Sequence, residues 1–420
     1  TPSKISQSLN DARNIFGSFS SSVLSFPNTT IASNSSTGLM RSSQTSLPFN
    51  PAYLNIAFTK NSDLGSGDPN NGLIDLTLIT SSGTVIGRRT EIPLSQFSSL
   101  LRGFYGKITS QRSLQPELNT SESSKLYSLF LQPLEEVLLS ENITSVLVSA
   151  DRGLQAIPFT ALARQGSFIV DRITFSLTPS LALTDLSVPF TGHEHDQILV
   201  MGSSEFNGLA PLPYVNQEVE NINELYNSSA VIDDDFTSNR LVSDLQSSSH
   251  PLVHLATHAD FKGGRPHESM IHTRDGFVTL DSFKDIRRQR KQRPIELFVL
   301  SACRSALGDK DSEMGLAGMA LQAGAKSAVG SLWYVDDVAT SAFFSLFYKY
   351  LRDGMTKSVA LGFTQRDFAA GKIKILGSDV IASSGDVLLS GLSTSQKYNY
   401  PNDFRHPFFW SGFVLLGTPW

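Results

Sequence analysis

Short apolar runs alternate with helical patterns through the second half of this 420-residue chain, and this alternation restricts the possible folds most strongly. The apolar runs are QILVMGSSE, AVIDDDFT, HPLVHLATHA, IELFVLSAC and KSAVGSLWYV. Amphipathic patterns such as VNQEVENINELY and SNRLVSDLQ separate them, and DDVATSAFFSLFYKYLRDG predicts a long helix that ends at its glycine. Short buried strands that alternate with helices predict a parallel sheet covered by helices on both faces.

The first half of the chain predicts a smaller α/β unit. From Pro51 the runs AYLNIAFT and GLIDLTLIT-SSG-TVIGRRTEI indicate strands, and the Ser-Ser-Gly turn predicts a hairpin. Helical patterns at 94–107 and 121–140 follow, and ITSVLVSADRGLQAIPFTAL predicts a strand that leads into a loop. Residues 1–50 hold fourteen serines and a weak helical pattern near Ile5–Phe19. We therefore expect a Ser-rich linker or lead-in at 1–50, an N-terminal α/β subdomain at 51–190 and a larger subdomain at 191–420.

Composition and charge argue against several classes of protein. The chain is 40% hydrophobic and 17% charged, and its net charge of −5 gives no general attraction to nucleic acid or membranes. We find no apolar run long enough to span a bilayer. The single cysteine excludes an internal disulfide and a cysteine-based zinc site, and an unpaired thiol fits the reducing cytoplasm. Because the chain begins Thr1-Pro2, we expect it to be a segment of a longer protein.

Three predicted strands end in chemically reactive residues: His258, Cys303 and the pair Asp336–Asp337. In parallel sheets chemistry collects at the carboxyl ends of the strands, so we expect these residues at one edge. A free cysteine is by default a small buried hydrophobe, but a nearby imidazole can activate it as a nucleophile. His254 shares a strand face with His258 but lies deeper, and we interpret it as a hydrogen-bonded core histidine.

Several segments in order resemble the CHAT family, caspase-like cysteine peptidases that are associated with tetratricopeptide repeats and related to separase. The segments are LYSLFLQPLEEVL, SADRGLQAIPFTAL, FSLTPSLAL, VHLATHADF, LFVLSACRSA, GLAGMALQAGAKSAVGSLWYVDD and HPFFWSGFVLLG. The resemblance implies a caspase-haemoglobinase fold, an α/β three-layer sandwich with a mostly parallel central sheet, preceded by a smaller α/β subdomain. The family includes the HetF type of filamentous cyanobacteria, and nothing in these residues selects that type over others.

The resemblance also assigns roles to individual residues. It implies a catalytic dyad of His258 and Cys303, with the backbone amides of Ala259 and Cys303 as oxyanion donors. The family usually has glycine where this chain has Ala259, but a backbone N–H can still donate there if the φ of the alanine is negative. We expect no metal and no cofactor.

The stretch SLWYVDD resembles the part of separase in which an aspartate lines the first specificity pocket. Asp337 is the closer match and Asp336 its neighbour. A buried carboxylate there would select arginine or lysine before the cut. The alternative is that one of the two caps the helix that follows, and we expect the pair to divide these roles.

Three other segments have alternative interpretations. RSALGDKDSEMG, directly after Cys303, could be a mobile substrate loop. The basic run RRQRKQR, from Arg287 to Arg293, is interpreted as a solvated helix end, with partner docking or self-cleavage as the alternative. The triplet Asp233-Asp234-Asp235 suggests a solvated loop rather than a calcium site, because no EF-hand pattern surrounds it.

The sequence therefore favours a cysteine endopeptidase that hydrolyses a specific partner protein through a thioester acyl-enzyme. We expect it to cut after a basic residue and to be regulated by an upstream repeat or a partner module. The alternative is a catalytically silent CHAT-type docking or signalling platform. The lack of a G-x-S-x-G elbow argues against an α/β hydrolase of another kind.

Overall fold

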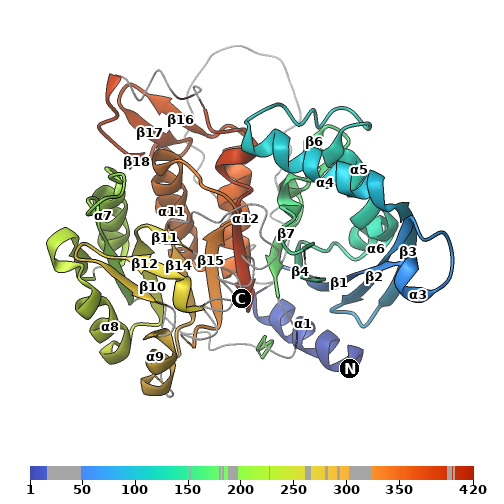
Figure 1. Ribbon diagram of the computed structural model, residues 1–420, viewed down its shortest axis with the longest axis horizontal. Coiled ribbons are helices and arrows are strands. Elements are labelled where there is room, and N and C mark those ends of the chain that lie inside the picture. The colour runs from blue at the N-terminus through green and yellow to red at the C-terminus, as the bar shows by residue number, and fades with distance from the viewer. Residues whose placement is uncertain are drawn as a thin grey trace, which may run out of the picture.

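An 11-stranded sheet runs through the computed structural model of this chain (Figure 1). The structure describes residues 1–16, 49–151, 153–178, 181, 184–187, 197–226, 228–260, 266–279, 282–290, 294–301, 324–394, 400 and 403–420. The strand order is β3-β2-β1-β4-β7-β19-β15-β14-β10-β8-β9, and most neighbours are parallel. The predicted α/β class with a mostly parallel central sheet is confirmed.

The strands of this sheet are β1 (Pro51–Lys60), β2 (Asn71–Thr80), β3 (Val85–Pro93), β4 (Ser145–Ala150), β7 (Thr174–Leu177), β8 (Ile198–Gly202), β9 (Ala230–Ile232), β10 (Leu252–Ala256), β14 (Leu297–Leu300), β15 (Ser327–Ser331) and β19 (Phe413–Gly417). The larger helices are α1 (Pro2–Phe16), α4 (Leu94–Thr109), α5 (Glu122–Phe130), α6 (Glu135–Ser140), α7 (Val215–Tyr226), α8 (Ser238–Ser247), α9 (Phe283–Gln289), α11 (Asp337–Arg352) and α12 (Lys357–Ala369). One three-stranded antiparallel sheet consists of β11 (Ala259–Asp260), β12 (Met270–His272) and β13 (Phe277–Thr279), and another of β16 (Ile373–Leu376), β17 (Asp379–Ala382) and β18 (Val387–Leu389). The short strands β5 (Ala163–Arg164) and β6 (Ser167–Phe168) form a two-stranded antiparallel sheet.

Alternate residues of the C-terminal strands pack into two different cores, which makes three layers. In β10, Leu252 and Ala256 belong to the core beneath α7 and α11, whereas Val253 and Leu255 belong to the core beneath α8 and α9 (Figure 1). This follows from the two-residue side-chain period of a strand. Because both faces are covered, β10 and β14 are buried throughout and consist of apolar residues apart from His254, as the sequence predicted.

The C-terminal strand β19 joins the two halves of the sheet. It is antiparallel to β15 and parallel to β7, so the strands on its two sides run in opposite directions. Gly412, just before β19, is required by a close approach, because a Cβ there would lie 2.7 Å from the Trp333 ring. The Trp333 indole donates to the Phe408 carbonyl at 2.9 Å, and the Phe343 ring stacks on Phe413 at 4.2 Å. The chain end therefore packs against the segment after β15 and against helix α11.

Some helices differ from the expected ones. The single pattern at 121–140 is divided into α5, a 3-10 turn at Gln132–Leu134 and α6, because Pro133 cannot donate a helical hydrogen bond. Helix α1 lies inside the predicted lead-in, and its Leu9 and Ala12 pack on Tyr53, Ile79 and Leu147 of the sheet. The divisions at residues 50 and 190 remain predictions.

Candidate functional site

Strands β8, β10, β14 and β15 run parallel, so their carboxyl ends lie at one edge of the sheet. His258 is placed two residues after β10 and Asp336–Asp337 a few residues after β15, at the start of α11. Cys303, and with it the predicted Cys303 amide donor, lies outside the described residues, which end at Ser301 on this side of the gap. The structure thus brings the predicted histidine and carboxylates to the expected edge.

Two residues of the β8–α7 loop hold the His258 ring. The Nε2 atom of His258 lies 2.8 Å from the carbonyl oxygen of Ala210. A carbonyl oxygen can only accept a hydrogen bond, so Nε2 carries the proton and Nδ1 is the basic nitrogen of the neutral imidazole. The Phe206 ring packs against the imidazole, with 4.7 Å between the centroids and 58° between the planes. These contacts fix both the tautomer and the orientation of the imidazole.

The backbone around His258 is held by the neighbouring strand β12. The His272 amide donates to the His258 carbonyl at 2.9 Å, and the Thr257 hydroxyl donates to the His272 carbonyl at 2.6 Å. Ala259 is buried in β11, and its backbone lies outside the left-handed region. The condition for an alanine at this position, a negative φ, is therefore met.

The two aspartates after β15 make different contacts. Asp336 is the N-cap of α11: its carboxylate accepts from the amides of Val338 at 2.9 Å and Ala339 at 3.3 Å, and the Tyr400 hydroxyl donates to it. Asp337 turns instead toward α7 and accepts from the Tyr214 amide at 3.1 Å. The expected helix cap is thus Asp336, and its neighbour carries no capping role.

Burial raises the pKa of the Asp337 carboxyl to about 7, although its hydrogen bond from Tyr214 acts in the opposite direction. The charges of Glu218 and Asp336 raise this pKa further. Burial also raises the pKa of Asp336, while its hydrogen bonds lower it. A positive charge placed beside Asp337 would favour its ionised form and lower its pKa. The site is therefore suited to a cationic partner.

His254 is a hydrogen-bonded core histidine, as predicted. Its ring is fully buried and its Nε2 atom lies 2.9 Å from a Glu218 carboxylate oxygen, while Nδ1 lies 3.2 Å from the Tyr348 hydroxyl. The Ser341 hydroxyl donates to the second Glu218 oxygen at 2.9 Å. This network links β10, α7 and α11 beneath the strand ends.

The other singled-out segments differ partly from expectation. Arg288 of the basic run is exposed and pairs with Asp285, but Arg290 is only 3% exposed and donates to the carbonyls of Leu245 and His250. The interpretation as a solvated helix end is therefore wrong for Arg290, and residues 291–293 lie outside the described residues. The loop after Cys303 also lies outside them.

Within the acidic triplet, Asp234 and Asp235 are exposed. Asp233 is not a solvated loop residue: its carboxylate accepts hydrogen bonds from Ser204 and Asn216. These bonds lower the pKa of Asp233 against the opposing effect of burial, which is the largest single influence on that pKa. Among the described residues, no group of three or more His, Cys, Asp or Glu side chains could hold a metal ion.

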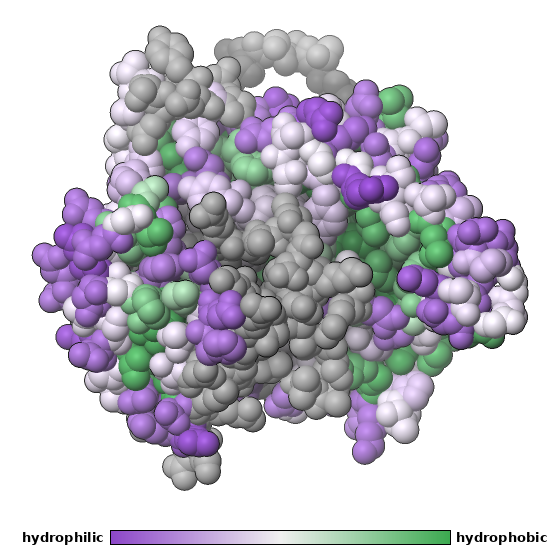
Figure 2. Space-filling model, viewed as in Figure 1, coloured by the Kyte–Doolittle hydropathy of each residue, from purple (hydrophilic) through white to green (hydrophobic). Residues whose placement is uncertain are grey.

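A cavity of about 100 Å³ lies elsewhere, between α6 and the amino ends of β4 and β7. Its lining includes Tyr127, whose pKa is raised to about 12 by burial and then by Glu135. Arg164 pairs with Glu135 there, so these charges neutralise each other. In the view of Figure 2, hydrophobic residues gather on the inner part of the right half, which holds this cavity, and a narrower hydrophobic strip lies among hydrophilic residues on the left half. The cavity contains none of the strand-end residues.

Across the described residues, no helix has the length and apolar character needed to cross a membrane.

Phe206, Ala210 and Asp233 were not found as site residues by sequence reasoning. A backbone carbonyl contact leaves no side-chain signal, so Ala210 could not have been identified. Asp233 could have been identified from its position directly after a predicted strand. The sequence analysis instead interpreted it as part of a solvated loop, together with its exposed neighbours.

A comparison with models of known families supports the resemblance. A family model described as the CHAT domain matches residues 120–418. Among solved structures, the chain is similar to one in the Saccharomyces cerevisiae separase–securin complex, with 12% identity and a TM-score of 0.47, covering 88% of this chain and 30% of that one. It is also similar to the complex of pro- and mature domains of Porphyromonas gingivalis RgpB, with 10% identity and a TM-score of 0.42, covering 70% of each chain. No curated protein sequence matches the chain significantly.

Proposed function

This chain belongs to the CHAT-domain family, and on that premise we propose that it is a cysteine endopeptidase that hydrolyses a specific partner protein. The observation that carries the proposal is the geometry of His258, whose Nε2 is bound to the Ala210 carbonyl so that Nδ1 is the nitrogen able to take a proton. A histidine held in one tautomer beside the end of a strand is suited to general acid–base catalysis.

The pairing register of β10 and β14 supports Cys303 as the partner of His258. Each paired residue of β10 lies opposite the residue 45 positions later, from Leu252 with Leu297 to Leu255 with Leu300. The Ser301 amide then donates to the Leu255 carbonyl at 2.8 Å, so the alignment holds to the end of the described strand. Cys303 follows His258 by the same 45 positions. If this register continues, the side chains of His258 and Cys303 would lie next to each other on the same face.

The proposed reaction is acyl transfer. His258 takes the proton of the Cys303 thiol at Nδ1, and the sulfur attacks the scissile carbonyl carbon. The amides of Ala259 and Cys303 stabilise the oxyanion, and His258 then gives its proton to the departing amine, which leaves a thioester. In the second half of the reaction His258 takes a proton from water and the hydroxide attacks the thioester. The carbon–sulfur bond then breaks, the departing thiolate takes the proton back from His258, and the new carboxylic acid releases its proton to solvent.

We place Asp337 at the pocket for the residue before the cut. Because Asp336 is engaged by the helix cap and Tyr400, Asp337 is the better candidate of the two. An arginine or lysine side chain would neutralise a buried carboxylate whose pKa burial holds at about 7. The proposed partners are a protein substrate and an upstream repeat or regulatory module that controls the activity. The proposed location is the cytoplasm.

The alternative is a catalytically silent CHAT-type docking or signalling platform. A peptidyl chloromethyl ketone with a basic terminal residue separates the two, because it alkylates the Cys303 sulfur quickly, with loss of chloride, only where the dyad is active. We expect a single adduct on Cys303, detected by intact-protein mass spectrometry, and no adduct in Cys303→Ala. Slow labelling, equal to that of the unfolded chain in urea, would favour the platform.

A further inference from the structure

The loop from Ser204 to Leu212 is closed at its base and carries two contacts to the His258 ring. The Leu212 amide donates to the Ser204 carbonyl at 2.8 Å, so the loop ends meet. Between them lie Phe206, whose ring packs against the imidazole, and Ala210, whose carbonyl oxygen accepts from Nε2. A loop of this kind places its middle only as well as its base is fixed. What fixes the base is therefore part of what orients the histidine.

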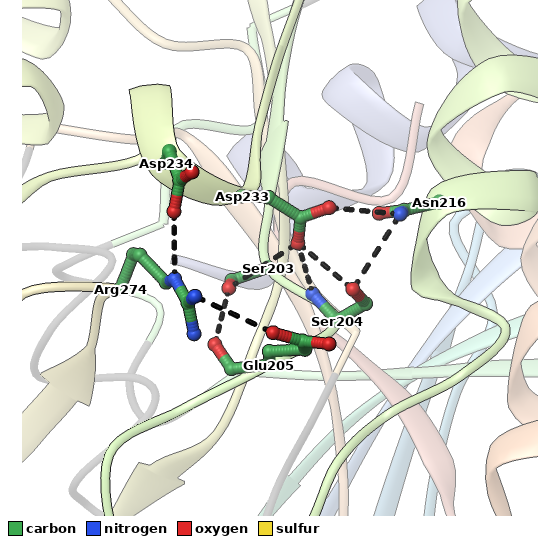
Figure 3. A network of polar contacts seen from close by, with 7 residues as sticks. All are labelled: Ser203, Ser204, Glu205, Asn216, Asp233, Asp234 and Arg274. Carbon is green, nitrogen blue, oxygen red and sulfur yellow. Dashed lines mark hydrogen bonds and ion pairs between the residues drawn. The ribbon is translucent and has the colours of Figure 1, made fainter.

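One carboxylate joins the two sides of that base (Figure 3). Asp233 accepts from the Ser204 amide at 2.7 Å and the Ser204 hydroxyl at 2.9 Å, on the strand side of the loop. Its other oxygen accepts from the Asn216 side chain at 2.9 Å, in the first turn of α7. Bonds to an ionised acceptor are stronger than bonds between neutral groups. Asp233 is thus a clamp across the loop, placed on the turn that follows the edge strand β9.

The backbone of Asp233 has an uncommon conformation. Its φ is +49°, in the left-handed region that few residues other than glycine adopt. Such conformations persist where the surrounding structure requires them, and they concentrate at functional sites. A second link supports the loop: Arg274, in the β12–β13 turn, pairs with Asp234 at 2.9 Å and with Glu205 at 3.3 Å (Figure 3). The same hairpin holds the His258 backbone through His272.

We infer that Asp233 is a positioning residue: by clamping Ser204 to Asn216 it fixes the loop whose Ala210 carbonyl and Phe206 ring orient His258 toward Cys303. The inference rests on the proposed dyad. It assigns to the first aspartate of the triplet a role in orienting the histidine, and it assigns none to the exposed Asp235. Displacement of the loop would leave Nε2 without its acceptor and allow the imidazole to turn, so that the thiol would lose its base.

The single cysteine of the chain permits a test that does not require a substrate. The rate of alkylation by iodoacetamide, measured against pH on the whole chain, reports the thiolate fraction of Cys303 alone. Asp233→Asn is the central variant, because asparagine tolerates the left-handed backbone and keeps the size of the side chain. Asp235→Asn is the matched control, with the same chemical change at an exposed position two residues away. His258→Ala is the reference for complete loss of the base.

We expect His258→Ala to move the alkylation profile toward an ordinary thiol, and Asp233→Asn to move it in the same direction, with alkylation at pH 6.5 slowed roughly fivefold to tenfold. Asp235→Asn should match the wild-type chain. Asn216→Ala, which removes the other end of the clamp, should act like Asp233→Asn and gives a second variant if that one does not fold. If His258→Ala shifts the profile but Asp233→Asn and Asn216→Ala do not, the positioning role is refuted while the dyad stands. If His258→Ala shifts nothing, the dyad itself fails and the inference with it.

Discussion

The Asp337 carboxyl makes the selection of a basic residue depend on pH in a predictable way. Its pKa is raised to about 7 by burial, with further contributions from Glu218 and Asp336. Only the ionised form offers a full charge to arginine, so the apparent affinity scales with the ionised fraction. For a pKa near 7 that fraction is about one tenth at pH 6 and about nine tenths at pH 8, so affinity for a basic ligand should rise about tenfold across this range.

Binding can be separated from catalysis in Cys303→Ala, in which titration of the thiol no longer contributes. The ligand is an acetyl-arginine amide, its neutral control is the isosteric acetyl-citrulline amide, and dissociation constants come from calorimetry or NMR at pH 6, 7 and 8. The arginine ligand should gain about tenfold and the citrulline ligand should not change. Adding Asp337→Asn should abolish the difference between the ligands, since asparagine still accepts from Tyr214 but carries no charge. If the affinity for the arginine ligand still rises about tenfold from pH 6 to pH 8 after Asp337→Asn, the assignment of Asp337 is refuted.

Two further predictions concern stability. Glu218→Ala leaves two buried groups, the His254 ring and the Ser341 hydroxyl, without their acceptor, and should lower the free energy of unfolding by roughly 2–5 kcal/mol in urea titrations; a loss below about 0.5 kcal/mol would show that the network relaxes. Gly362→Ala should destabilise by about 1–3 kcal/mol, because the added Cβ would lie 2.2 Å from a methyl carbon of Thr174. Gly106→Ala, in a helix with open space around it, is the matched control and should stabilise by about 0.5–1 kcal/mol; equal effects at the two glycines would contradict the packing argument.

Local elements were predictable from the sequence because their patterns report burial directly. The Ser-Ser-Gly hairpin is present as β2 and β3, with Ile79 paired to Val85. The apolar runs that end near Gly202, Ala256, Leu300 and Ser331 are all strands of one sheet. Placement of His258 and the aspartates at one edge follows from parallel strand direction, which the alternation with helices already implied.

The sheet order and the support of the histidine could not be predicted in this way. Strand β19 lies in the middle of the sheet although it ends the chain, and its position depends on packing such as that of Phe343 on Phe413. Helix α12 is buried on most sides, so its sequence lacks the apolar stripe of a surface helix. The His258 acceptor is a backbone carbonyl, Ala210, which any residue would supply.

Cleavage itself gives the most direct test of the proposed peptidase. Proteins of the source cell are incubated with this protein or with its Cys303→Ala variant, and the new amino termini are mapped by mass spectrometry. We predict cleavage sites in one or a few proteins that follow arginine or lysine and are absent with Cys303→Ala, while circular dichroism shows the same fold for both. Cleavage that persists in Cys303→Ala would contradict the cysteine mechanism, and the lack of any site that depends on Cys303 would contradict the peptidase itself.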